Sequence, residues 1–162
     1  MADSRDKGKR GEYQIRDLLR EKTEMEWERV PGSGGFGASH GLKGDIYLPH
    51  ATGRMSKFAI EVKWYKDEHL NSNIMKTTPT QLDKWLDQTY REAGQMNAKP
   101  MLVFKKDRGD WIVCIDEADY NEISDKLASA NPTIKYAKGD RSLYLINFKQ
   151  FLSLVSTEDL VR

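Results

Sequence analysis

The stretch Lys57-Phe58-Ala59-Ile60-Glu61-Val62-Lys63-Trp64 alternates with the period of two that is typical of a β-strand. Its even-numbered positions are all apolar and predict a face that packs on a core. Its odd-numbered positions place Glu61 and Lys63 together on the opposite face, about 7 Å apart. A carboxylate and an ammonium group therefore leave the same side of a strand that is otherwise built for burial.

The segment before this strand predicts an antiparallel partner for it. Asp45-Ile46-Tyr47-Leu48 also alternates, and the residues from Pro49 to Gly53 have the composition of a hairpin connection. If the two strands pair, the Asp45 carboxylate approaches that of Glu61. A further short strand is expected near residues 27–31.

A helix is expected over residues 8–22, with one acidic residue on its inward face. Glu12, Ile15 and Leu19 are spaced i, i+3 and i+7, so Glu12 continues the apolar stripe. A third carboxylate, from a separate element, is thus available to Asp45 and Glu61. Taken separately, each of the three also has an ordinary explanation as a solvated strand, turn or helix residue.

Carboxylates that converge in a fold need a compensating charge. Two of them about 4 Å apart repel by about 4 kcal/mol at an effective dielectric constant near 20. Mg²⁺ is typically bound by one or two carboxylates together with water and phosphate oxygens. Lys63 could then orient or activate a water molecule, or offset charge on the phosphate. The pattern predicts a site for a divalent cation and a phosphate group.

The rest of the chain alternates between expected helices and strands, which favours the α/β class. A helix is expected over residues 79–94, with Thr78 as N-cap and Gln81 completing a capping box. Apolar runs at 100–104 and 111–115 predict strands that are covered on both faces, and the second run places Cys114 in the core. A helix over 117–130, a strand over 143–147 and a helix over 148–155 follow.

The composition fits one folded domain over the 162 residues. Charged residues make up 31% of the chain, but the formal net charge is only +1, and four Trp, seven Tyr and five Phe favour a packed fold over disorder. The single cysteine excludes an intramolecular disulfide and a cysteine-based zinc finger. The lack of a long apolar run or an apolar signal core predicts a cytoplasmic protein without a membrane segment.

Residues 32–44 are rich in glycine and predict a loop. The segment from Gly32 to Gly37 matches G-x-G-x-x-G, the pattern of a dinucleotide-binding turn. That pattern needs a helix directly after it to bind the pyrophosphate, and here the chain continues into a strand. A dinucleotide site is therefore excluded.

Four segments, in this order, resemble the PD-(D/E)xK nuclease superfamily and, within it, the archaeal-type Holliday junction resolvases. They are Lys9-Arg10-Gly11-Glu12, Arg29-Val30-Pro31, Lys43-Gly44-Asp45-Ile46 and Ile60-Glu61-Val62-Lys63. The resemblance covers about residues 7–105. Gly44 stands where many members have proline, and the loop from Gly32 to Lys43 is longer than in the compact resolvases.

The resemblance implies a restriction-endonuclease-like core with a central mixed β-sheet flanked by helices. Within one nuclease domain, we expect a catalytic core over about 7–115 and a C-terminal extension over about 116–162. The resemblance also implies that Glu12, Asp45, Glu61 and the Val62 backbone carbonyl bind Mg²⁺ or Mn²⁺, with Lys63 as the catalytic lysine. The implied activity is hydrolysis of DNA phosphodiester bonds in recombination and repair, with a homodimer placing paired nicks in a two-fold symmetric four-way junction.

Several polar residues flank the expected site in sequence and could contact DNA phosphates. They are Lys9, Arg10, Arg29, Ser33, Lys43 and Gln81. Gln81 resembles a glutamine that some superfamily members use near the site, but the capping box explains it equally well. For the others, a solvated charge or a polar loop is the alternative.

Two other functions stay open on the sequence alone. One is a repair or restriction-type nuclease that acts on linear, flap or single-stranded DNA. The other is a non-catalytic DNA-binding module on the same fold, since a fold does not prove an activity. The retained lysine and all three carboxylates argue against the module.

Overall fold

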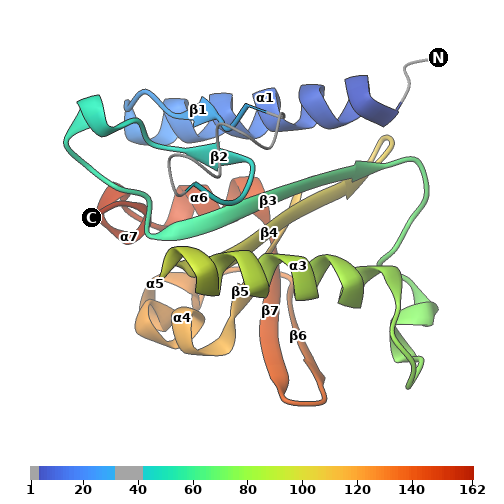
Figure 1. Cartoon of the computed structure of the whole chain (residues 1–162). Helices are drawn as coiled ribbons and strands as arrows, with labels where there is room; N and C mark the ends of the chain where they lie inside the picture. The colour runs from blue at the N-terminus through green and yellow to red at the C-terminus, as the bar shows by residue number, and fades with distance from the viewer. Residues whose placement is uncertain (1–3, 32–41) are drawn as a thin grey trace.

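A computed structural model describes residues 4–31 and 42–162 (Figure 1). Its seven-stranded mixed sheet has the order β1-β2-β3-β4-β5-β7-β6. The strands are β1 (Glu28–Arg29), β2 (Ile46–Tyr47), β3 (Phe58–Tyr65), β4 (Lys99–Lys106), β5 (Ile112–Asp116), β6 (Thr133–Lys138) and β7 (Arg141–Asn147). The helices are α1 (Ser4–Thr23), α3 (Gln81–Met96), α4 (Glu117–Glu122), α5 (Ser124–Leu127), α6 (Phe148–Leu154) and α7 (Thr157–Leu160), with 3-10 turns η1 (His50–Thr52) and η2 (Ser72–Met75).

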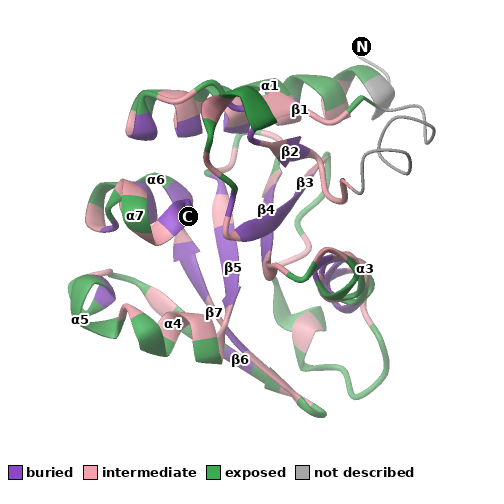
Figure 2. Cartoon of the chain, turned by 60° about the vertical axis from the view of Figure 1, so that its left-hand side comes forward, coloured by how far each residue is buried: buried purple, intermediate pink, exposed green. Residues whose placement is uncertain are grey.

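Helices cover both faces of the sheet, which confirms the expected α/β architecture. On one face, Ile15 and Leu19 of α1 pack with Phe148 and Phe151 of α6 against the sheet. On the other face, α3 packs through Leu82, Trp85 and Leu86, the largest apolar residues of its inward side. Figure 2 shows the result as buried central strands between helices whose outer faces are exposed. None of the described helices is both long and apolar enough to cross a membrane.

The centre of the sheet is a parallel pair, and its outer neighbour on one side is short. β3 runs parallel to β4 over its whole length, from Phe58 beside Lys99 to Tyr65 beside Lys106. β2 pairs with β3 only where Ile46 faces Ile60. The carboxyl-terminal half of β3 therefore has an edge that β2 leaves open.

Several predicted boundaries are wrong for identifiable reasons. α3 begins after Thr80, not Thr78, because the capping box joins Thr80 to Asp83 instead of using Gln81. The predicted helix over 117–130 is two helices, because the backbone of Ile123 is not helical. The connection after β2 joins two antiparallel strands, as expected of a hairpin, and contains η1. β6 was not predicted.

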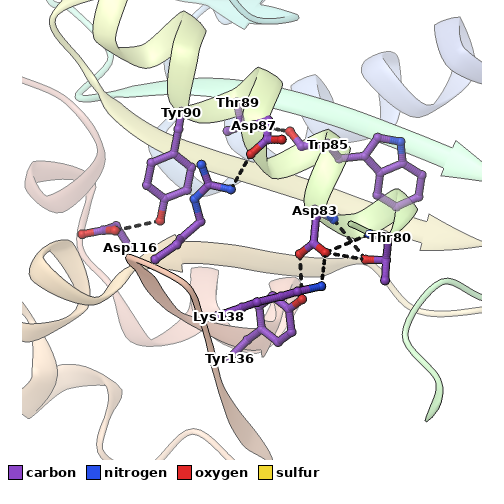
Figure 3. A network of polar contacts seen from close by, with 10 residues as sticks. Thr80, Asp83, Trp85, Asp87, Thr89, Tyr90, Asp116, Tyr136 and Lys138 are labelled. Carbon is purple, nitrogen blue, oxygen red and sulfur yellow. Dashed lines mark hydrogen bonds and ion pairs between the residues drawn. The ribbon is translucent and has the colours of Figure 1, made fainter. Parts of the chain in front are cut away.

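A polar network holds α3 against the hairpin formed by β6 and β7 (Figure 3). The Asp83 carboxylate accepts hydrogen bonds from the Tyr136 hydroxyl at 2.7 Å and from the Lys138 ammonium group. One turn or more further along α3, Tyr90 donates to Asp116 at 2.7 Å, and Arg141 donates to Asp87. Residues beyond 115 thus fix the position of α3 on the sheet.

We expect Asp83→Asn to reduce the free energy of unfolding by about 2 kcal/mol at pH 7, because the half-buried Lys138 would lose its carboxylate partner. Burial alone would raise the pKa of Asp83, but the hydrogen bonds from Lys138, Tyr136 and Thr80 hold it at about 2. Since this pKa lies below that of the unfolded chain, the carboxylate stabilises the fold above about pH 4 and loses this effect as the pH falls towards 2. Urea unfolding at several pH values measures the difference.

The matched control is Asp87→Asn on the same helix, whose carboxylate is 62% exposed beside Arg141. An exposed ion pair contributes about 0–1 kcal/mol, so this variant should unfold nearly like the wild type. Equal losses for the two variants, or a loss for Asp83→Asn that persists at pH 2, would show that Asp83 is not the anchor.

Candidate active site

A pocket of about 650 Å³ lies at the open edge of β3. It is lined by Glu12 of α1, Asp45 before β2, and Glu61, Val62 and Lys63 of β3, with residues such as Gln88 of α3 on its far side. In Figure 1 the amino-terminal part of α1 lies above the ends of β3 and β4. The structure therefore brings together all four side chains that the sequence suggested for one site.

Asp45 is held by the backbone of β3. Its N–H donates to the Ile60 carbonyl at 2.7 Å, and its Oδ2 accepts from the Val62 N–H at 2.8 Å. The carboxylate thus takes the place that a longer β2 would fill. Because the N–H and C=O of one strand residue point to the same edge, the Val62 carbonyl also faces the pocket.

Glu61 is buried, with only 3% of its surface exposed, and has acidic neighbours. Burial, the Asp45 charge and contact with the carboxyl group of Glu92 all raise the pKa of Glu61. Burial and the Glu12 charge likewise raise the pKa of Asp45. The fold has placed acidic groups where their negative charge is costly.

Lys63 is joined to Glu61 through a glutamine. The Lys63 ammonium donates to Oε1 of Gln88 at 2.9 Å, and Nε2 of Gln88 lies 3.4 Å from Oε2 of Glu61. This bridge orients the lysine beside the carboxylate without a direct ion pair between them. Lys63 is therefore held ready to meet an anionic group that enters the pocket.

Gln88 and Glu92 are not among the predicted site residues, although the sequence carries a signal for both. They follow Trp85 by three and seven residues, the spacing that singled out Glu12 on the first helix. Polar residues on the inward stripe of α3 thus mark the second wall of the site.

Glu12 reaches the pocket with a partner of its own. Its Oε2 accepts from Nε of Arg29 at 2.8 Å, and both side chains are largely buried. Arg29, proposed as a phosphate contact, is engaged by Glu12 in this structure. The pair links α1 to β1 and fixes the direction of the Glu12 side chain.

The other residues predicted to contact DNA lie in different places. Lys9 and Arg10 are exposed on α1, and Lys43 is half-buried just before Asp45. Ser33 lies outside the described residues. Gln81 lies at the start of α3 and lines a separate pocket with His69 and Asn73. It is therefore not among the residues that line the pocket at the edge of β3.

The donor set fits a hard divalent cation in two respects. The pocket offers carboxylate and carbonyl oxygens, the ligands that Mg²⁺ and Mn²⁺ prefer. Oε2 of Glu92, beside Glu61, is buried without a hydrogen-bond partner. Over residues 4–31 and 42–162, however, no group of three His, Cys, Asp or Glu side chains is arranged as a complete metal site. The predicted set of three carboxylate ligands stays a prediction.

Comparison with known proteins identifies a family and a relative of high identity. A family model described as "Phage putative PDDEXK endonuclease" matches residues 3–162. Protein D14 of Escherichia phage T5 is 52% identical over 160 residues, which is 99% of this chain and 98% of that protein. No solved structure matches the chain.

Proposed function

Because the chain belongs to the family of phage PD-(D/E)xK endonucleases, we propose that it hydrolyses DNA phosphodiester bonds in the pocket at the edge of β3. The observation that carries this proposal is the convergence of Glu12, Asp45, Glu61 and Lys63 from three separate segments of the chain. Buried carboxylates with raised pKa values are unfavourable in isolation and become useful when they bind a cation.

Asp45 and Glu61, with the Val62 carbonyl and Glu12, are the groups that would bind Mg²⁺ or Mn²⁺. When bound, such an ion polarises phosphate oxygens and lowers the pKa of a coordinated water molecule. Lys63, oriented by Gln88, places its positive charge where a scissile phosphate would enter and can hold the attacking water by a hydrogen bond. Arg29 keeps Glu12 directed into the pocket.

For the substrate, we propose a four-way DNA junction, cut by paired nicks. The support is the order of the Glu12, Lys-Gly-Asp45 and Glu61-Val-Lys63 segments, which resembles the archaeal-type resolvases. A two-fold symmetric junction would require two copies of the site, so we propose a homodimer.

The test is cleavage, with Mg²⁺ or Mn²⁺, of a four-way junction offered beside linear duplex, flap and single-stranded DNA. We expect symmetric nicks in opposite strands of the junction, and none with the Asp45→Asn variant. End-dependent degradation of linear or flap DNA would overturn the proposal that the substrate is a four-way junction. It would instead support a repair-type or restriction-type nuclease.

Titration calorimetry with Mn²⁺ separates the enzyme from a non-catalytic module. We expect heat of binding for the wild type that is lost in Asp45→Asn. DNA binding without metal binding and without cleavage by the wild type would overturn the proposed activity.

A further inference from the structure

Two tryptophans and a lysine form a row across the sheet beside the pocket. Trp64 of β3 pairs in register with Lys105 of β4. Trp111 comes just before β5, one position beyond the last pair of β4 and β5, which is Phe104 with Ile112. The Lys105 ammonium group lies 4.4 Å from the centre of the Trp64 ring and 5.5 Å from that of Trp111.

A second cation reaches the same ring from α1. The guanidinium carbon of Arg10 lies 4.9 Å from the centre of the Trp64 ring. Among the described residues, neither Arg10 nor Lys105 forms an ion pair with an acidic side chain. Lys7, the third cation near this ring, differs because Asp107 accepts both of its short hydrogen bonds, at 2.8 and 2.9 Å.

Trp64 connects these cations to the active site. Trp64 is one of the residues that line the pocket, beside Val62 and Lys63. The indole N–H donates to Asp107 at 2.9 Å, and the ring meets Trp111 edge to face at 6.1 Å. A ring fixed in this way attracts both cations to its face. The nearby Asp107 carboxylate feels the charge of Lys105 but forms its short hydrogen bonds with Lys7.

We propose that Arg10 and Lys105, held by Trp64, form a phosphate clamp that binds the DNA backbone next to the bond to be cut. The clamp rests on the proposed function, since it places the strand that enters the pocket. The ligand class is a phosphodiester backbone, because cations close to the Trp64 ring compete with a base for its face. Contacts of this kind position DNA without reading its sequence.

The test measures DNA affinity by fluorescence anisotropy over a range of NaCl concentrations, in EDTA so that no cleavage occurs. The variants are Arg10→Gln, Lys105→Gln and the double variant. Each lost phosphate contact should reduce the slope of log Kd against log salt by about 0.9 and weaken binding about eightfold at 0.1 M salt. Lys105→Arg keeps the charge and should keep the wild-type slope.

Lys22→Gln is the matched control, because Lys22 lies near the other end of α1, roughly 18 Å along the helix from Arg10. It should bind DNA with the wild-type slope. The clamp would be overturned if the double variant kept the wild-type salt slope. It would also be overturned if Lys22→Gln reduced that slope as much as Arg10→Gln or Lys105→Gln does.

Failure of the clamp and failure of the proposed function are distinguishable. The clamp is read from binding without metal, whereas the nuclease activity is read from cleavage by the wild type with metal. If the wild type never cleaves DNA but the variants show the predicted changes in salt slope, the proposed nuclease activity alone is overturned. A wild type that cleaves while the double variant keeps its slope would overturn the clamp alone.

Discussion

Replacing Glu61 with glutamine is expected to lower the rate of DNA cleavage by more than a thousandfold and to raise the stability of the metal-free protein. The two effects have one cause. The carboxylate is buried beside Asp45 and Glu92, so its charge opposes folding until a cation binds it. Glutamine nearly preserves the shape, removes the repulsion and cannot replace an anionic ligand. A gain of about 1–3 kcal/mol is expected at pH 8.

The sign of the pH dependence follows from the raised pKa of Glu61. The folded protein retains this proton at pH values where the unfolded chain has lost it, so wild-type stability falls as the pH rises above about 4.5. The glutamine variant should show a flatter dependence. Adding Mg²⁺ should stabilise the wild type and leave the variant almost unchanged.

Urea unfolding in EDTA and a single-turnover cleavage assay measure the two halves of this prediction. Glu21→Gln is the control, because it makes the same chemical change at an exposed position of α1. A Glu61→Gln protein that cleaves at the wild-type rate, or that is less stable than the wild type at pH 8, would contradict the role assigned to this carboxylate.

The elements that carry the site could be predicted because each has a strong local pattern. Every even-numbered residue of β3 is apolar, and the packing of this face and the shared direction of Glu61 and Lys63 both follow from that pattern. Glu12 was found from its place on the apolar stripe of α1. The approach of Asp45 to β3 followed from the expected antiparallel pairing of two consecutive strands, which the structure confirms.

The elements that were missed depend on contacts between distant parts of the chain. β6 is an edge strand in which Tyr136 alone is buried, so its sequence carries almost no periodicity. Thr78 and Thr80 are both good N-caps, and the choice between them is tied to Asp83, whose other partners Tyr136 and Lys138 come much later in the sequence. Local patterns cannot report such partners.

The two sides of the pocket also differ in whether local sequence patterns could predict them. The wall formed by Asp45 and β3 is local and was predicted. The position of Gln88, which lines the opposite side, and of Glu92, which contacts Glu61, depends on how α3 docks. That docking is fixed by β6 and β7, which lie outside the segment that resembles the resolvases. The carboxyl-terminal part of the chain thereby acts on the site through the position of one helix.

Gly44→Ala is expected to have the largest effect on stability of any single methyl group added near the site. Gly44 has a φ of +84°, and a Cβ there would lie 2.7 Å from the Ile60 carbonyl oxygen and 3.0 Å from the Ile60 nitrogen. Those atoms belong to the central strand and cannot move without disturbing the sheet. We expect a loss of about 3 kcal/mol or more, together with at least a hundredfold loss of cleavage, because the adjacent Asp45 would be displaced from Val62.

Gly53→Ala separates backbone strain from the clash. Gly53 also has a positive φ, of +73°, but a Cβ there would meet nothing within 4 Å. Gly53→Ala should therefore cost only the 1–2 kcal/mol or so of a left-handed alanine and leave cleavage intact.

Proline, found at the position of Gly44 in many related nucleases, fixes φ near −65°. At position 44 of this chain it should therefore be tolerated no better than alanine. If Gly44→Ala unfolds in urea like Gly53→Ala and cleaves like the wild type, the close approach of Gly44 to Ile60 does not position Asp45.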